Sequence, residues 1–307
     1  MAAQRDFRTS TLDAEAVERL ASELSGAELQ SLLLHVMERR AARRAPRDLV
    51  EQYGRDLFCI PSNVDQRTAV ELDTHLLAAA EGFEAIELSP VAPLGVSSVV
   101  APTSQNRVLS ATRSAEVVSD PTNVLALECA LRLRRKRAAT IHLATSQRVI
   151  RTQPFPPGKG HTQHFRLFAL ASAGQEQQDH AFTVSTLLLH IRTLLRALER
   201  LEQHGYAFGR RRVEVLSAPG REAIAQRVAQ SLGALAGVGP LEHAYYSGGL
   251  RFKLWVTAAD GAEMPLIDGG AFDWLQKLAA DRRAVLIASG VGAQLMALRF
   301  RTGQPPP

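Results

Sequence analysis

The sequence predicts an α+β fold built on a mostly antiparallel sheet flanked by helices. Helical and strand-like stretches mix along its 307 residues without the regular strand–helix alternation of a parallel α/β protein. Several strand-like stretches follow one another directly, which favours antiparallel pairing. The length suits one large domain or two modest ones, and 46% hydrophobic with 22% charged residues is ordinary for a globular protein.

The first 46 residues are predicted to form a separate helical segment. Two apolar stripes at helical spacing occupy residues 11–45, and Ser25 with Glu28 forms a capping box at the start of the second stripe. Pro46 marks its end. This segment is either a small N-terminal module or an arm packed on a main domain that spans residues 47–300. For the tail, residues 301–307, we expect disorder.

Residues 61–119 are expected to hold one helix followed by short strands. A turn precedes an apolar stripe of helical spacing at residues 69–80. Residues 83–88 then read as a strand, and 97–101 and 107–109 are short β-like runs. Next, Asp120 is predicted as the N-cap of a helix with Pro121 at its first position, where proline is tolerated. The arginine run at 132–137 closes that helix at the negative end of its dipole.

The stretch from Thr145 to Gly174 reads as a strand, a polar loop and a second strand. Residues 148–153 alternate, so that Arg151 shares a sheet face with Val149 and Gln153. Prolines and glycines break the pattern at 154–160, and Lys159 and His161 are placed at the loop tip. Because its planar fork is already oriented, an arginine on a rigid strand suits a phosphate or carboxylate.

One long helix and several shorter elements complete the predicted sheet. Leucine-rich spacing at 184–201 predicts a core or interface helix. The other elements predicted downstream are strands at 213–216, 251–256 and 285–289, and helices at 221–235 and 271–279.

Composition narrows the possible settings and partners. The N-terminus lacks an apolar signal region, and no apolar run approaches the roughly 18 residues of a membrane span, so we expect a cytoplasmic protein without a membrane partner. Cys59 and Cys129 each lie in an apolar-periodic segment and are expected to be reduced core thiols. The net charge of +5 permits nucleic-acid or phosphate binding. Solvated helix ends explain the three arginine runs, at 39–44, 132–137 and 210–212, more simply.

Common catalytic and metal motifs do not match. Residues 157–160 read Pro-Gly-Lys-Gly, but the Ser or Thr and the helix that a Walker loop requires do not follow. His161 and His164 have no cysteine or carboxylate at metal-ligand spacing, so we expect no metal site. Nine scattered histidines do not by themselves define a catalytic triad.

Taken in order, five places in the chain resemble the catalytic core of class II aminoacyl-tRNA synthetases. The similarity is to the histidyl-tRNA synthetase branch, including the synthetase-like regulatory subunit of ATP phosphoribosyltransferase, and covers about residues 47–300. The places are Gly82-Phe83-Glu84-Ala85-Ile86-Glu87-Leu88-Ser89-Pro90, Asp120-Pro121-Thr122, the 145–174 hairpin, His243-Ala244-Tyr245-Tyr246-Ser247-Gly248, and the glycine-containing segments 268–275 and 288–295.

The resemblance implies a substrate pocket. Asp120 would bind a substrate amino group beside Thr122, unless it serves only as the helix N-cap. Arg151 would be the catalytic residue that contacts the α-phosphate of ATP and the substrate carboxylate, while Phe165 would stack on adenine. Gln153 stands where this class has a Glu that contacts the adenine amino group. Further substrate-binding positions implied are Tyr245, Tyr246, Gly248, Gly269 and Gly270.

Several positions depart from the pattern of this class. Leu295 replaces the arginine that binds the ATP γ-phosphate, which removes a charge-assisted contact of about 1.5–3 kcal/mol. Ala271 replaces a second arginine, and Leu241 and Ala244 replace the Arg and Asp of the histidine-binding segment. We also expect no anticodon-binding domain. Two arginines outside the motif are potential substitutes for the γ-phosphate contact: Arg282 and Arg299.

Three functions remain open. The first is a synthetase-like paralogue that binds an amino-acid-like or nucleotide ligand in a regulatory or partner-docking role, which accounts for the departures together. The second is an ATP-dependent ligase that forms an acyl-adenylate with Mg²⁺, with Arg151 stabilising charge at phosphorus. The third, a nucleic-acid-binding protein, is disfavoured because aromatic residues are scarce among the basic runs. Segments 82–90 and 184–201 favour a homodimer, and a protein partner fits the first function.

Overall fold

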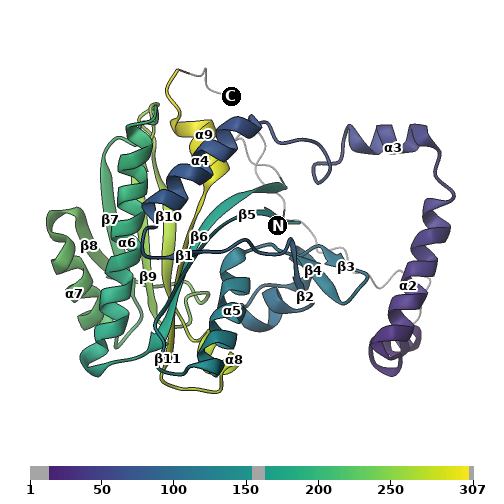
Figure 1. Cartoon of the computed structure of the whole chain (residues 1–307), viewed down its shortest axis with the longest axis horizontal. Coiled ribbons are helices and arrows are strands. Elements are labelled where there is room, and N and C mark those ends of the chain that lie inside the picture. The colour runs from purple at the N-terminus through teal and green to yellow at the C-terminus, as the bar shows by residue number, and fades with distance from the viewer. Residues whose placement is uncertain (1–13, 154–162, 304–307) are drawn as a thin grey trace.

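An eight-stranded mixed sheet forms the centre of the computed structural model (Figure 1). The structure describes residues 14–153 and 163–303. The strands in sheet order are β1 (Glu84–Ala85), β5 (Ile141–Ile150), β6 (His164–Gln175), β11 (Ala284–Gly292), β10 (Glu263–Phe272), β9 (Leu250–Thr257), β7 (Arg211–Ser217) and β8 (Ala236–Pro240). Only the two edge pairs, β1 with β5 and β7 with β8, are parallel. The predicted α+β class and mostly antiparallel sheet are therefore confirmed.

Helices cover both faces of the sheet, as α6 and α5 show on its two sides in Figure 1. The face that we call the back carries α4 (Gln66–Ala79), α6 (Ala181–Glu202), α7 (Glu222–Leu232) and α9 (Ala293–Phe300). The opposite face, which we call the front, carries α5 (Pro121–Arg135) and α8 (Trp274–Leu278). Because side chains alternate along each strand, the two faces bury separate apolar clusters.

The predicted hairpin is confirmed as β5 and β6. The two strands pair antiparallel from Ile141 with Ala173 to Ile150 with His164. The predicted loop tip, with Lys159 and His161, lies outside the described residues, as does the Pro-Gly-Lys-Gly sequence. Arg151 follows β5 directly, and its backbone N–H donates to the carbonyl of Gln163 at 2.9 Å. The hairpin therefore holds Arg151 at the end of a rigid strand.

A small three-stranded sheet lies between α4 and α5 in the sequence. It consists of β2 (Val91–Pro93), β4 (Ala115–Val117) and β3 (Ser110–Ala111). Beyond residue 60, the short helical turns in the described part of the chain are η3 (Val96–Val100), η4 (Gln105–Arg107), η5 (Gln178–His180) and η6 (Gly233–Leu235). The predictions of β-like runs at 97–101 and 107–109 were wrong, since η3 is a π-helical turn and η4 ends at Arg107. The buried carboxylate of Glu116 accepts the backbone N–H groups of Gly95 at 2.8 Å and Ser97 at 2.9 Å, and so fixes η3 from a distant strand.

The N-terminal helices form an arm that extends away from the sheet (Figure 1). Its elements are α1 (Ala14–Glu18), η2 (Arg19–Glu23), α2 (Gly26–Ala41) and α3 (Pro46–Tyr53), and none of the residues described in them is buried. The predicted capping box is present, because the Ser25 hydroxyl accepts from the Glu28 N–H and the Glu28 carboxylate accepts from the Ser25 N–H. Pro46 begins α3, which the sequence did not predict, instead of ending the segment.

Other differences follow from chain context. The strand predicted at 83–88 pairs only over β1, and the helix predicted at 271–279 shortens to α8 because β10 continues to Phe272. Strands β8 and β10 were missed because their glycines weaken the β pattern, and α9 was missed as well. Cys59 is exposed and is not a core thiol. Cys129 is buried in the front cluster, which raises its thiol pKa to about 12.

The stretch Gln178–Glu202, which contains α6, is long and apolar enough by length and composition to cross a membrane. The expectation of no such run was therefore wrong. In this fold, however, Leu187, Ile191 and Leu194 are buried in the back-face cluster. Of the two alternatives for this helix, core and interface, the structure makes it a core helix.

Candidate functional site

Asp120 caps α5 with one carboxylate oxygen and presents the other to the front of the sheet. Oδ1 accepts the Thr122 backbone N–H at 3.0 Å and the Thr122 hydroxyl at 2.8 Å. Among the residues that the structure describes, Oδ2 has two long contacts, at 3.5 Å each, with Nη2 of Arg151 and the hydroxyl of Tyr245. These distances exceed those of good charge-assisted hydrogen bonds. The N-cap role and a ligand-binding role are therefore compatible, because they use different oxygens.

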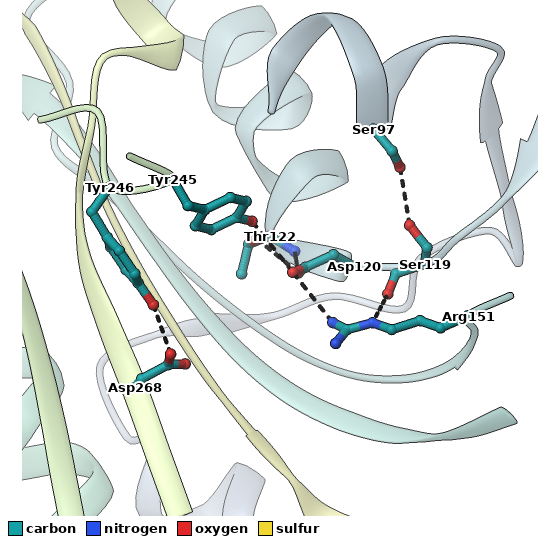
Figure 2. Close-up of polar contacts among 8 residues, drawn as sticks. All are labelled: Ser97, Ser119, Asp120, Thr122, Arg151, Tyr245, Tyr246 and Asp268. Atoms are coloured by element: carbon teal, nitrogen blue, oxygen red, sulfur yellow. Dashed lines mark hydrogen bonds and ion pairs between the residues drawn. The ribbon is translucent and has the colours of Figure 1, made fainter. Parts of the chain in front are cut away.

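Arg151 is oriented by the chain segment that precedes α5. Its Nε donates to the backbone carbonyl of Ser119 at 2.9 Å, and the Ser119 hydroxyl lies 3.0 Å from that of Ser97 (Figure 2). Its guanidinium also lies over the Phe165 ring, 5.3 Å from the ring centroid. The Nε hydrogen bond and the Phe165 ring orient the guanidinium so that Nη2 points toward Asp120. The sequence placed these two residues 31 positions apart, and the fold brings them together.

Tyr246 forms a second polar group with Asp268 and Arg251. The Tyr246 hydroxyl donates to the Asp268 carboxylate at 2.7 Å (Figure 2), and Nη2 of Arg251 donates to the same oxygen at 2.8 Å. The Arg251 guanidinium also lies 4.7 Å from the Tyr246 ring centroid. Burial and the Asp268 charge raise the pKa of Tyr246, and burial with the Asp120 charge raises the pKa of Tyr245. Both phenols therefore remain neutral hydrogen-bond donors at neutral pH.

Two adjoining cavities, of about 160 and 350 Å³, lie in front of the sheet at these residues. We call them together the front cleft, which is defined by the five residues that line both: Asp120, Arg151, Tyr245, Tyr246 and Asp268. The smaller cavity is bounded by backbone of β10 and β11, including Gly269 and Gly290. The larger is polar and adds Arg107, Gln153 and His243 to its lining.

The structure brings most of the predicted site residues to this cleft. Thr122 and Gly269 line the smaller cavity and Gln153 lines the larger one. Phe165 lines neither cavity, and its ring packs against the Arg151 guanidinium. Gly248 lies on a different cavity beside α6, where its N–H donates to the Ala271 carbonyl at 3.0 Å.

Gly270 also has a packing role. A Cβ atom there would lie 2.2 Å from the Leu250 carbonyl oxygen and 2.6 Å from Cδ1 of Tyr246. Glycine therefore lets β9 and the Tyr246 ring approach β10. Its contribution to the front cleft is indirect, through the position of Tyr246.

Sequence reasoning missed several side chains of the cleft. Asp268 was part of the resembling segment but was not singled out, and Arg251, Arg107 and His243 were not assigned to the site. A signal for Arg251 and Asp268 exists only after the strand register is known, because β9 and β10 place them near one another. The grouping of Arg251, Asp268 and Tyr246 could therefore be recognised only from the folded structure.

Leu295 and Ala271, which stand where the synthetase pattern has arginines, place no positive charge in the front cleft. Leu295 packs against the back-face cluster, and Ala271 is buried in it. The two potential substitutes are engaged elsewhere, since Arg299 pairs with Asp260 at 2.8 Å and Arg282 lines the cavity beside α6. Among the described residues, the cations that line the front cleft are Arg107, Arg151 and Arg251. Within residues 14–153 and 163–303, no three His, Cys, Asp or Glu side chains group as metal ligands.

Solved structures share this fold. One is an ATP phosphoribosyltransferase regulatory subunit/histidyl-tRNA synthetase from Bacillus halodurans C, at 15% identity and a TM-score of 0.56 over 78% of this chain and 80% of that one. Apo S. aureus histidyl-tRNA synthetase aligns at 13% identity and a TM-score of 0.58, over 78% and 69% of the two chains. A Cryptosporidium parvum Iowa II threonyl-tRNA synthetase structure aligns at 11% and 0.60, over 78% and 67%.

These similarities define the class of fold. The chain has the class II aminoacyl-tRNA synthetase core fold, with neighbours among histidyl-tRNA synthetases and the regulatory-subunit type, as the sequence predicted. At identities of 15% or less, they establish the fold alone. No protein-family model matches the chain, and no curated protein matches it in sequence.

Proposed function

We propose that this chain is a non-catalytic relative of the class II synthetases whose front cleft binds an amino-acid-like ligand in a regulatory or partner-docking role. The observation that carries the proposal is the placement of Asp120 Oδ2 and the Arg151 guanidinium 3.5 Å apart in one cleft. One group complements an ammonium and the other a carboxylate, so together they match a zwitterion. Each group is also anchored through its remaining atoms, which preorganises the site.

The lining of the smaller cavity suits a compact ligand. Tyr245, Tyr246 and Phe272 supply aromatic surface, and their rings pack against one another with centroids 5.3 to 5.5 Å apart. Such a lining with a few fixed polar groups is typical of small-molecule sites. The Asp268 carboxylate marks one side, where a ligand donor such as an imidazole, amide or hydroxyl would be accepted. The ligand class is therefore a polar amino acid or an analogue of one.

A nucleotide ligand, or ATP-dependent formation of an acyl-adenylate with Mg²⁺, is the second candidate. Arg107, Arg151 and Arg251 around the larger cavity favour an anionic ligand. Two positions fit ATP poorly, however, because Leu295 is apolar and Phe165 does not line either cavity. The residues present thus suit an amino acid better than MgATP, and we place catalysis second.

The second and third basic runs give little support to nucleic-acid binding. Arg132 pairs with Glu84 and Glu128, and Arg137 pairs with Asp281 at 2.9 Å. In the third run, Arg211 pairs with Glu202 and Arg212 with Glu263. These arginines are therefore largely neutralised within the fold.

We further propose a cytoplasmic homodimer with a protein partner. Support for a dimer rests on the edge of the main sheet at β1 and on two exposed apolar side chains, Val91 in β2 and Leu94 directly after it. An unpaired strand edge with apolar neighbours is a common surface for association. The other predicted dimer segment, residues 184–201, packs its apolar side chains against the back-face cluster, so we do not include it in the proposed interface.

A thermal-shift screen tests the proposed function. Twenty amino acids, ATP with Mg²⁺, and each amino acid together with ATP are added separately to the full chain. We expect at least one polar amino acid to raise Tm without ATP, because a ligand at 100 times its Kd stabilises the native state by about 2.7 kcal/mol. A response to ATP alone, with amino-acid-dependent pyrophosphate exchange, would replace this proposal with the second candidate.

A further inference from the structure

A second cavity, of about 340 Å³, lies behind the sheet. It opens between the N-terminal part of α4, the start of α9 and the back face of β5 and β6. Its polar lining residues are Ser62, Gln66, Arg148, Arg166 and Gln294. Arg148 and Arg151 are three residues apart on the same strand and its extension, so they project to opposite faces. This back cavity is thus separate from the front cleft.

Two arginines face each other across β5 and β6 in this cavity. Arg148 and Arg166 are register partners in the antiparallel pair. Like charges placed directly opposite destabilise a sheet unless a counter-charge is present. Asp73 supplies one counter-charge, because its carboxylate pairs with Arg166 and also accepts the Ser146 hydroxyl at 2.5 Å. Asp73 therefore offsets one of the two cations.

Arg148 is paired with a neutral group. Its Nη2 and Nε lie 2.6 and 3.1 Å from Nδ1 of His164, whose Nε2 lies 2.7 Å from the Ile60 carbonyl. A carbonyl only accepts, so Nε2 carries the proton and Nδ1 accepts from Arg148. His164 in this arrangement is an uncharged imidazole. Among the described residues, no carboxylate forms an ion pair with Arg148, and burial together with Arg166 lowers its guanidinium pKa.

The cavity therefore carries an excess of one positive charge and a surplus of donors. Nε of Arg166 is buried and has no hydrogen-bond partner among the described residues. Ser62 and Gln66 add a hydroxyl and an amide to the wall. We propose that the back cavity binds a small oxyanion, a phosphate or carboxylate group held between the Arg148 and Arg166 guanidinium groups. Among the described residues, Nη1 of Arg148 and Nη2 of Arg166 have no hydrogen-bond partner, and each would donate a charge-assisted hydrogen bond to an oxygen of the anion.

Calorimetric titration of the full chain with inorganic phosphate, at constant ionic strength, tests this site. Acetate is titrated in a parallel arm to distinguish phosphate from carboxylate. We expect binding to the wild type and at least a tenfold loss of affinity in Arg148→Gln, whose amide still donates to His164. Arg148→Lys, which keeps the charge but loses the fork, is a second variant should Arg148→Gln fail to fold. Arg113→Gln, an exposed arginine on the loop between β3 and β4, is the matched control and should bind normally.

A comparison with Arg151→Gln separates the two faces of the sheet. Binding that persists in Arg151→Gln but falls in Arg148→Gln supports the back cavity. The proposed anion site would be overturned by equal affinity in the wild type and Arg148→Gln, or by no binding of either anion to the wild type. Loss of binding in Arg151→Gln alone would place the anion in the front cleft and also overturn the proposal.

Discussion

Nη2 of Arg151 lies 3.5 Å from Oδ2 of Asp120, close enough to attract but too far for a strong ion pair. The two groups are partly exposed, with side-chain exposures of 30% and 26%, so solvent screens their mutual attraction. A zwitterionic ligand placed between them would give each a closer partner. This geometry is the basis of the proposed amino-acid site.

Tyr246→Phe tests the buried hydrogen bond to Asp268. Loss of the hydroxyl removes a 2.7 Å bond to a carboxylate, and we expect the free energy of unfolding to fall by about 1.5–3 kcal/mol. Urea denaturation of both proteins measures the difference. Tyr53→Phe, at an exposed tyrosine of the N-terminal arm, is the control and should change stability by less than about 0.5 kcal/mol. Equal stabilities of wild type and Tyr246→Phe would show that the bond contributes nothing.

Gly270→Ala tests the close approach of β9, β10 and Tyr246. The added Cβ would collide with the Leu250 carbonyl and the Tyr246 ring, so overpacking should cost about 1–3 kcal/mol. Displacement of Tyr246 should also weaken binding of any ligand found for the front cleft. Gly237→Ala on β8 is the matched control, because nothing lies within 4 Å of its added Cβ. A stable Gly270→Ala protein with unchanged ligand affinity would contradict the packing role.

His190 should make stability depend on pH. The ring is fully buried between the Ser172 and Ser289 hydroxyls, at 2.8 Å from each, and burial lowers its pKa to about 3. Below pH 6.5 the unfolded chain gains a proton at His190 while the native state stays neutral. The contribution of His190 to the free energy of unfolding is therefore complete above pH 6.5. It declines by about 1.4 kcal/mol per pH unit as the pH falls from 6.5 toward 3.

His190→Gln is the matched variant for this effect, since an amide also offers a donor and an acceptor but does not titrate. Urea unfolding at pH 7.5, 6.0 and 5.0 compares the two proteins. We expect the wild type to lose stability more steeply with falling pH. Parallel pH profiles would show that His190 does not control the acid response.

Pyrophosphate exchange tests the absence of catalysis. Leu295 packs against the back-face cluster, and neither Arg282 nor Arg299 lines the front cleft, so we expect no amino-acid-dependent exchange of pyrophosphate into ATP. Leu295→Arg should not create activity, because the position points into apolar packing. Exchange by the wild type that disappears in Arg151→Ala would establish the adenylate-forming alternative.

Local chemistry made some of the fold and site predictable from sequence. Asp120 and Pro121 predict the start of α5, because an N-cap side chain and a proline at the first helical position act on neighbouring residues alone. The alternation before residue 151 likewise predicted a strand that carries Arg151 to the site. These signals depend on neighbours along the chain, so they survive without knowledge of the fold.

Other features depend on residues that meet only in the folded chain. The η3 turn is fixed by Glu116, some 20 residues away, and so a β-like sequence became helical. Asp268 entered the site through its pairing with Arg251 and Tyr246 across strands. The glycine-containing β10 owes its strand structure to two partners, β9 and β11, which outweigh its low intrinsic propensity.

The central claim is that Asp120 binds the ammonium of an amino-acid-like ligand, and one thermodynamic cycle tests it most directly. The best amino acid from the screen and its N-acetyl derivative are titrated calorimetrically into the wild type and Asp120→Asn. Asparagine caps helices as well as aspartate, so α5 should be retained. We predict that acetylation weakens binding to the wild type at least tenfold and has little further effect in Asp120→Asn. An equal loss on acetylation in both proteins would contradict the assignment of Asp120.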